Sequence, residues 1–230
     1  PKTRYSDDGL YMKKSDIGLF ENPEDIQFFW FQEWVQNYVQ VEEIMEDPDN
    51  SDNVIVRMDK QIWSYSNPSI DTKWRKTSIP FYILNAMELM DTPGECYYNK
   101  KTGILYYIPM PDENMETAAV IVPSVEKLVD VYGYDIDEKV ENITFEGLEF
   151  AHSAWEALST GSSTPRQAQS WLGWFNDISV VIPGAVELEM TKNINFYNNR
   201  FFGLQQVGVY LENGVEKTNM VGNAFYELGD

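Results

Sequence analysis

Short runs of alternating apolar and polar residues dominate the first half of the chain. Four such runs, each five or six residues long, are separated by turn-forming residues: 26–31, 39–44, 53–58 and 104–108. Runs of this length with a period of two, bounded by Asn, Asp, Pro and Gly, are typical of antiparallel β-strands. Residues 83–90 are rich in helix formers and end shortly before Pro93-Gly94, which predicts one short helix.

The second half of the chain carries an internal repeat. Three windows align, and each ends in a phenylalanine: 140–150, 191–201 and 215–225. The last two start 24 residues apart, and the first starts 51 residues before the second, about two such units with a small insertion. A strand pattern with this period, with Asn and Gly between short strands, is typical of a parallel β-solenoid.

In a solenoid, equivalent inward side chains stack into columns at the ordinary strand spacing of about 4.8 Å. The repeat therefore predicts one inward column of Phe150, Phe201 and Phe225, and another of Ile143 and Ile194. Upstream of the last two windows, residues 184–189 resemble residues 207–212 after a register change of one. The alternative is an antiparallel sandwich whose Asn-rich strands resemble one another by coincidence.

The polar, proline-punctuated stretch 109–114 is the best internal boundary. The predicted architecture is all-β in two parts. Residues 1–118 form a β-rich, sandwich-like flanking region, and residues 119–230 form the solenoid rungs.

Composition narrows the ligand class. The 230 residues include 17 Lys+Arg and 37 Asp+Glu, for a formal net charge of −20. Nucleic acid and anionic lipid are unfavourable partners for such a chain, and acidic substrates are repelled at long range. Neutral ligands remain. No apolar run reaches the roughly 18 residues of a membrane-spanning helix, so no membrane partner is expected, and the oligomeric state is left open.

Cysteine and histidine usage excludes several kinds of site. The lone cysteine, Cys96, excludes an intrachain disulfide, and the lone histidine, His152, excludes a His-cluster metal site. The acidic residues between Asp47 and Asn53 lack the Gly and closing Glu of an EF-hand and fit a polar turn better. We expect no metal and no cofactor.

A pair of glutamates offers the chemistry of glycoside hydrolysis, which requires two carboxyl groups across the scissile bond. With Leu188 and Leu211 pointing inward, Glu189 and Glu212 occupy equivalent outward positions one turn apart. Stacked carboxylates repel, which raises the pKa of one and makes it a usable acid. The alternative is a pair of solvated surface glutamates. Weaker candidates for the same roles are Glu187, Asp177 and Asp230.

Aromatic residues could bind a sugar. A Ser/Gly/Pro tract at 161–165 precedes Trp171 and Trp174, whose flat rings suit pyranose stacking or, alternatively, cap the core beneath a loop. Tyr210 lies on the same predicted strand face as the glutamates.

Several stretches resemble the right-handed parallel β-helix glycoside hydrolases of plant-fibre bacteria, of the β-xylosidase, xylanase and fucosidase type. The resemblance lies in these segments: 85–111, with P-G-E-C-Y at 93–97 and G-I-L-Y-Y-I-P at 103–109, then 119–123, 140–155 and 198–208. The aromatic-rich stretch 24–44 also resembles the region that flanks the helix in this family.

The resemblance implies right-handed parallel β-helix rungs after a β-rich region, and a carbohydrate-active protein that is a glycoside hydrolase or a segment of a longer one. It implies an oligo- or polysaccharide of plant or host origin as substrate, in a secreted or periplasmic setting. The family usually has Trp where this chain has Cys96, which predicts a buried Cys96. A histidine is common at the position of His152, which with Trp155 could contact a sugar; a structural histidine is the alternative.

Two rival functions stay open beside hydrolysis. The first is a non-catalytic carbohydrate-binding β-helix module that uses aromatic residues such as Trp171 and Trp174. The second is a structural segment with no activity of its own.

Overall fold

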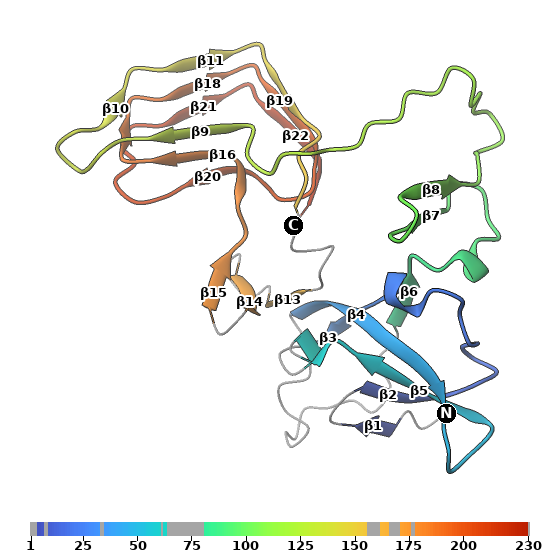
Figure 1. Ribbon diagram of the computed structural model, residues 1–230. Helices are drawn as coiled ribbons and strands as arrows, with labels where there is room; N and C mark the ends of the chain where they lie inside the picture. The colour runs from blue at the N-terminus through green and yellow to red at the C-terminus, as the bar shows by residue number, and fades with distance from the viewer. Residues whose placement is uncertain are drawn as a thin grey trace. The chain divides into compact units, whose positions relative to one another are not determined.

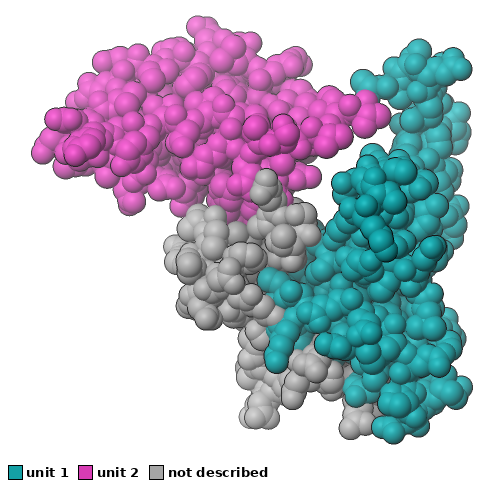
Figure 2. Space-filling model, viewed as in Figure 1, with its two compact units in different colours: residues 1–119, 157–180 teal, residues 120–156, 181–230 magenta. Residues whose placement is uncertain are grey.

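The computed structural model is all-β apart from short helical turns. It describes residues 4–6, 9–32, 35–60, 62–63, 81–155, 162–165, 171–175 and 178–229. The chain forms two compact units (Figure 2): unit 1 comprises residues 1–119 and 157–180, and unit 2 comprises residues 120–156 and 181–230. The predicted all-β class is confirmed. Residues 157–180, a predicted loop inside the second part of the chain (119–230), group instead with unit 1.

Unit 1 is built on one antiparallel half-barrel sheet rather than two facing sheets. Its main strands, in spatial order, are β1 (Arg4–Ser6), β2 (Gly9–Lys13), β5 (Asn53–Met58), β4 (Val35–Glu46), β3 (Gln27–Gln32) and β6 (Phe81–Leu84). The strand β13 (Ser162–Pro165) adds antiparallel to β4. Two hairpins complete the unit: β7 (Cys96–Asn99) with β8 (Ile104–Tyr107), and β14 (Trp171–Phe175) with β15 (Ile178–Val181).

The alternation seen in the sequence explains the core of unit 1. In β5, Val54, Val56 and Met58 are buried and the residues between them are not. Phe28 on β3 and Val39 on β4 face the same core and are fully buried. A register shift at Val41/Glu43 bends β4, as bulges do, so that one strand pairs with β3 along its first half and with β5 along its second.

Two expectations for unit 1 are wrong. Residues 83–90, where a helix was predicted, are instead the end of β6 and a single 3₁₀ turn, η2 (Met87–Leu89). Residues 81–84 pair with β3, and Asn85 then adopts a positive φ of 57°, which turns the chain away from the strand. Cys96 is exposed rather than buried. Side chains alternate between the two faces of β7, and because Tyr97 points toward the interior, the preceding Cys96 points outward.

A second 3₁₀ turn, η1 (Pro23–Asp25), anchors the β7–β8 hairpin through a buried carboxylate. Asp25, which is 1% exposed, accepts hydrogen bonds from Tyr97 Oη at 2.5 Å and from the backbone N–H of Lys100 at 3.3 Å. Burial and the contact with Asp25 raise the pKa of Tyr97 to about 12.

Unit 2 consists of three successive passes of the chain whose strands pair in parallel (Figure 1). The first pass contains β9 (Val129–Tyr132), β10 (Val140–Glu141), β11 (Thr144–Glu146) and β12 (Glu149–Ala151). The second contains β16 (Gly184–Glu189), β17 (Thr191–Lys192), β18 (Asn195–Tyr197) and β19 (Arg200–Leu204). The third contains β20 (Val207–Leu211), β21 (Asn219–Val221) and β22 (Ala224–Leu228).

The predicted phenylalanine column is confirmed. Phe150 pairs with Phe201 and Phe201 with Phe225, with ring centroids 4.7 and 4.5 Å apart and the rings nearly parallel. Phe201 is fully buried, whereas Phe225, on the third pass, is 43% exposed. Ile143 and Ile194 also share this core. The one-residue register change is confirmed too, since Leu188 pairs with Leu211.

Residues with a left-handed backbone conformation (positive φ) lie at the corners of each pass. One corner has positive φ at Asn142, Asn193 and Lys217, the next at Gly147, Asn198 and Gly222, and a third at His152, Gly203 and Glu227. Asn and Gly adopt this conformation at the lowest cost, which accounts for their presence between the strands. His152 therefore occupies a turn position.

A buried amide column supports the corner before the phenylalanines. Asn199, 1% exposed, accepts the backbone N–H of Leu148 at 2.9 Å, and its Nδ2 donates to the carbonyl of Phe145 at 2.9 Å. Asn223 repeats the arrangement one pass later, with Nδ2 donating to the carbonyl of Phe196 at 2.9 Å. These amides satisfy backbone groups that the turns leave unpaired.

Candidate active site

Carboxylates gather on the outer face of the sheet formed by β9, β16 and β20. Leu188 points into the core, so its neighbours Glu187 and Glu189 point outward. Glu187 lies between Asp130 on the first pass and Tyr210 on the third, and Glu189 lies beside Tyr132. The backbone N–H of Glu212 donates to the Leu188 carbonyl at 2.8 Å, which places Glu212 next to Glu189. We call the four acidic residues Asp130, Glu187, Glu189 and Glu212 the carboxylate face.

Glu187 is fixed at the centre of this face. Its side chain is nearly buried and forms an ion pair with Lys127, whose Nζ also lies 3.4 Å from Asp130 Oδ2. Its Oε1 accepts the backbone N–H of Gly184 at 2.8 Å. A Cβ on Gly184 would lie 2.6 Å from the Cβ of Tyr210, so only glycine allows the two strands this approach. The hydrogen bond to Glu187 raises the pKa of Lys127.

Glu212 has the opposite electrostatic character. Burial raises the pKa of its carboxyl above the usual value, and the negative charges of Glu189, Glu187 and Asp130 raise it further. Lys127 opposes this shift and does not cancel it. The direction is the one that the sequence predicted, although burial contributes more than the stacked Glu189. Glu212 therefore favours the protonated form relative to an isolated glutamate.

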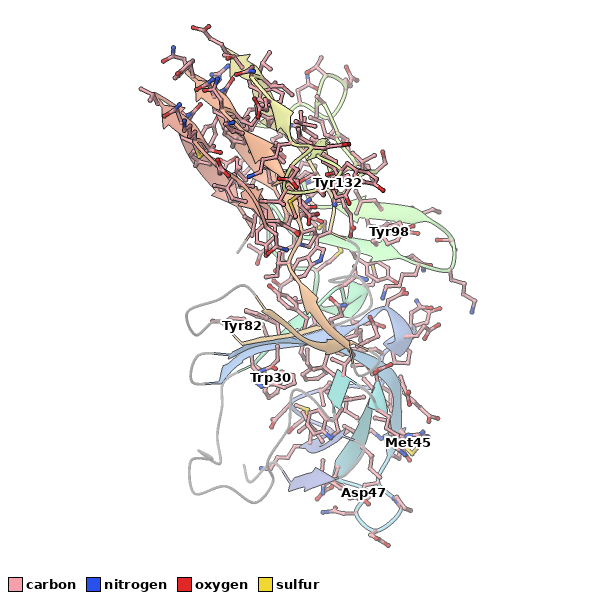
Figure 3. All side chains as sticks on the ribbon, turned by 90° about the vertical axis from the view of Figure 1, so that its left-hand side faces the viewer. Trp30, Met45, Asp47, Tyr82, Tyr98 and Tyr132 are labelled. Carbon is pink, nitrogen blue, oxygen red and sulfur yellow. The ribbon has the colours of Figure 1, made fainter. Side chains whose placement is uncertain are left out.

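This arrangement contains the elements of acid–base chemistry on a glycosidic bond. A carboxyl with a raised pKa can donate a proton to a leaving group, while a neighbouring carboxylate acts as base or nucleophile. Glu189 is the half-buried neighbour available for the second role, because Glu187 is already engaged by Lys127 and Gly184. Tyr210 and Tyr132 flank the carboxylates, and Tyr132 is 61% exposed (labelled in Figure 3).

The structure brings together three of the residues singled out in the sequence, namely Glu189, Glu212 and Tyr210. His152 lies instead at the corner after β12, edge-on to Phe202 with ring centroids 5.5 Å apart. Trp155 is 6% exposed, and its backbone N–H donates to Gln205 Oε1 at 2.9 Å. The ring of Trp155 thus belongs to the interior.

The side chains of the remaining predicted residues lie outside the part of the chain that the structure describes. Trp171 and Trp174 fall on β14, whose backbone is described and whose side chains are not. Asp177 and Asp230 are not among the described residues. Their predicted roles stay predictions.

Sequence reasoning missed Asp130 and Lys127. The signal was present, because the alternation Val129-Asp130-Val131 matches Val186-Glu187-Leu188. The repeat windows began at residue 140, and the irregular stretch 133–139 hid the equivalence of β9 with β16. A comparison of charge position along each strand would have found it.

Among the described residues, no three or more His, Cys, Asp or Glu side chains are placed to hold a metal ion. The segment between Asp47 and Asn53 is a hairpin turn in which Asp47 Oδ1 accepts the backbone N–H of Asp49 at 3.0 Å. No helix in the described ranges is both long and apolar enough to cross a membrane.

Comparison with known proteins gives two matches. Residues 7–110 match the family model of the GH141 insertion domain. A solved structure described as a glycoside hydrolase matches with a TM-score of 0.67 and 22% sequence identity, over 85% of this chain and 37% of the other. None of the curated proteins matches in sequence.

The family match lies within unit 1, and the structural match extends over most of both units. The chain spans little more than a third of the length of the solved structure, and at this identity the likeness concerns the fold. Residues 7–110 are thus similar to an insertion domain named for GH141, and the fold of most of the chain is similar to that of a protein described as a glycoside hydrolase.

Proposed function

We propose that this chain is part of a glycoside hydrolase that cleaves a neutral oligo- or polysaccharide on the carboxylate face of unit 2. The observation that carries the proposal is the position of Glu212, whose pKa is raised, next to Glu189 at the end of the neighbouring strand. The matches to a GH141 insertion domain and to a glycoside hydrolase fold support the same reaction class. The charge of −20 favours a neutral substrate.

In this proposal each residue has one role. Glu212 is the general acid that protonates the leaving oxygen, and Glu189 is the carboxylate that activates water or attacks the sugar. Glu187 is held in place by Lys127 and Gly184, and its charge contributes to the raised pKa of Glu212. Tyr210 and Tyr132 offer ring surface to the sugar on either side of the acidic pair.

We further propose that the three passes of unit 2 are rungs of a right-handed parallel β-helix and that the enzyme is of the β-xylosidase, xylanase or fucosidase type. The parallel register of the phenylalanine column and the repeated left-handed corners support the first statement. A substrate of plant or host polysaccharide would place the protein outside the cytoplasm, in a secreted or periplasmic setting.

The test is hydrolysis of xylo- and fuco-oligosaccharides by the chain and by Glu212→Gln and Glu189→Gln variants. Each substitution should lower the rate by roughly 10²–10⁴ without unfolding the protein, because Gln keeps the shape and loses the acid or the anion. Glu146→Gln is the matched control, since Glu146 is an exposed glutamate on β11, outside the carboxylate face. Full activity in both variants would refute the site.

A non-catalytic carbohydrate-binding role is the second candidate. The exposed ring of Tyr132 beside Glu189 favours it, because an aromatic ring can hold a sugar without chemistry at the neighbouring carboxylates. Glycan binding without turnover, unchanged by Glu212→Gln and weakened by Tyr132→Ala, would favour this role over hydrolysis.

A further inference from the structure

Three aromatic residues form a row across the sheet of unit 1. Tyr82 on β6 is directly opposite Phe29 on β3, which is directly opposite Tyr38 on β4. The rings of Phe29 and Tyr38 stack with centroids 4.6 Å apart, and those of Phe29 and Tyr82 are 6.0 Å apart. We call Tyr82, Phe29 and Tyr38 the aromatic row.

The aromatic row lies on the side of the sheet opposite the core. Phe28 and Trp30, the neighbours of Phe29 along β3, are buried in the core of unit 1. Figure 3 shows Trp30 and Tyr82 on opposite sides of the sheet. Tyr82 is 61% exposed, and its strand β6 is the last of the described strands in the order of this sheet, so the row ends in an exposed ring.

The strands that carry the row have no charge. None of the residues of β3, of β6 or of the first half of β4 (35–40) is Asp, Glu, Lys or Arg, although such residues make up 23% of the chain. The charged side chains of this sheet begin beyond the row, where Arg57 pairs with Glu42 and Glu43. Tyr82 is exposed while Phe29 and Tyr38 are half-buried, and an exposed position that needs only solubility has no reason to exclude charge around it in this way.

We propose that the aromatic row is a non-catalytic binding surface for a neutral glycan chain, with Tyr82 as the ring on which a pyranose stacks. The flat apolar face of a tyrosine matches the C–H face of a sugar ring, and its hydroxyl can donate or accept a hydrogen bond. Phe29 packs beside Tyr82 and is itself stacked on Tyr38, which limits the side-chain freedom lost on binding.

Charge decides between glycans and other occupants of this surface. A polyanionic polysaccharide or a nucleic acid would meet a chain of net charge −20, and among the described residues the one lysine bound to these strands, Lys100 at Gln40, is a single charge against it. A neutral glycan avoids that repulsion and requires no charged partner. The proposal shares its ligand class with the proposed hydrolysis, and it uses none of the residues of the carboxylate face.

The experiment is isothermal titration of the intact chain with xylohexaose and cellohexaose, compared across variants. Tyr82→Ala should weaken binding by about tenfold, while Tyr82→Phe, which keeps the ring, should stay within about twofold. Tyr98→Ala is the matched control: Tyr98 is a 47% exposed tyrosine on β7 of the same unit, and its loss should leave the affinity unchanged. Glu146→Gln, at an exposed residue of β11 outside both proposed sites, should also bind normally.

The outcomes separate this proposal from the proposed function. Binding that depends on Tyr82 supports the glycan surface, whether or not the chain hydrolyses the sugar. Binding that is equal in Tyr82→Ala and in the unaltered chain overturns the proposal, as does the absence of binding to both sugars. Concentration-dependent dimerisation that Tyr82→Ala abolishes, without sugar binding, would assign the surface to a second copy of the chain and also overturn it.

Discussion

In unit 1 the strands pair largely with their neighbours in sequence, β1 with β2, β3 with β4 and β4 with β5, whereas every pairing in unit 2 joins successive passes of the chain. In the phenylalanine column of unit 2 the partners lie 51 and 24 residues apart. Unit 1 buries its core with one alternating pattern per strand. Unit 2 buries its core only because each pass covers the next.

The comparison shows how the effect of a substitution on stability depends on the unit that carries it. A position in unit 2 has an equivalent above or below it, so one substitution alters a whole column. A position in unit 1 has no such equivalents, and its contribution depends on local partners. Three substitutions sharpen this contrast, from the largest expected effect to the smallest.

Phe201→Ala should cause the largest loss, about 3–5 kcal/mol of unfolding free energy, because Phe201 is fully buried between two stacked rings. Chemical denaturation of the chain measures it. Phe225→Ala removes the same ring from the third pass, where it is 43% exposed, and should cost clearly less. Equal losses would mean that the column does not act through burial.

Asn199→Ala should cost about 2–3 kcal/mol, because it leaves the backbone N–H of Leu148 and the carbonyl of Phe145 without their side-chain partner. The same denaturation experiment applies. Asn219→Ala is the control, since Asn219 is exposed and its Nδ2 reaches only Asn195 Oδ1, at 2.7 Å. A loss of stability no greater than that of the control would show that the amide column does not stabilise unit 2.

Tyr97→Phe should have the smallest effect, about 1–2 kcal/mol near neutral pH, because it removes one hydrogen bond to the buried carboxylate of Asp25. The same substitution should also change how the free energy of unfolding depends on pH above pH 9. The folded pKa of Tyr97 is about 12 against an ordinary value of 10.0, so the folded state holds this proton when the unfolded chain has lost it. The resulting stabilisation is complete below pH 10 and is lost as the pH rises from 10 toward 12.

Denaturation between pH 9 and 12 measures the difference. The unaltered chain should lose more stability over this range than Tyr97→Phe, which has no phenol to titrate. Parallel curves for the two proteins would show that Tyr97 does not titrate differently in the folded state.

The same contrast explains what the sequence could predict. In unit 2 the period of the windows predicted the partners themselves, so Phe150, Phe201 and Phe225 were paired correctly, and Glu189 was placed beside Glu212. In unit 1 the alternating runs predicted the strands and not their order in the sheet. Nothing local in the sequence indicates that β3 pairs with β6 across about 50 residues.

The errors have physical causes of the same kind. The stretch 83–90 has helix-forming residues, but pairing of its first residues with β3 outweighed that weak preference. Asp130 and Lys127 escaped notice because irregular residues separate β9 from the repeat window. The role of burial in raising the pKa of Glu212 could not be predicted, since burial depends on neighbours from all three passes.

The segment between the first two passes of unit 2 limits how the two units can be exchanged between proteins. Residues 157–180 leave unit 2 after β12, supply the strand β13 to the sheet of unit 1, and return to begin β16. A cut at residue 119, where a linear reading places the border, would separate β4 from this strand and open the edge of the sheet. The two units are therefore interlaced along the polypeptide. Gene fusion or shuffling that exchanges one of them would have to carry both of its segments together.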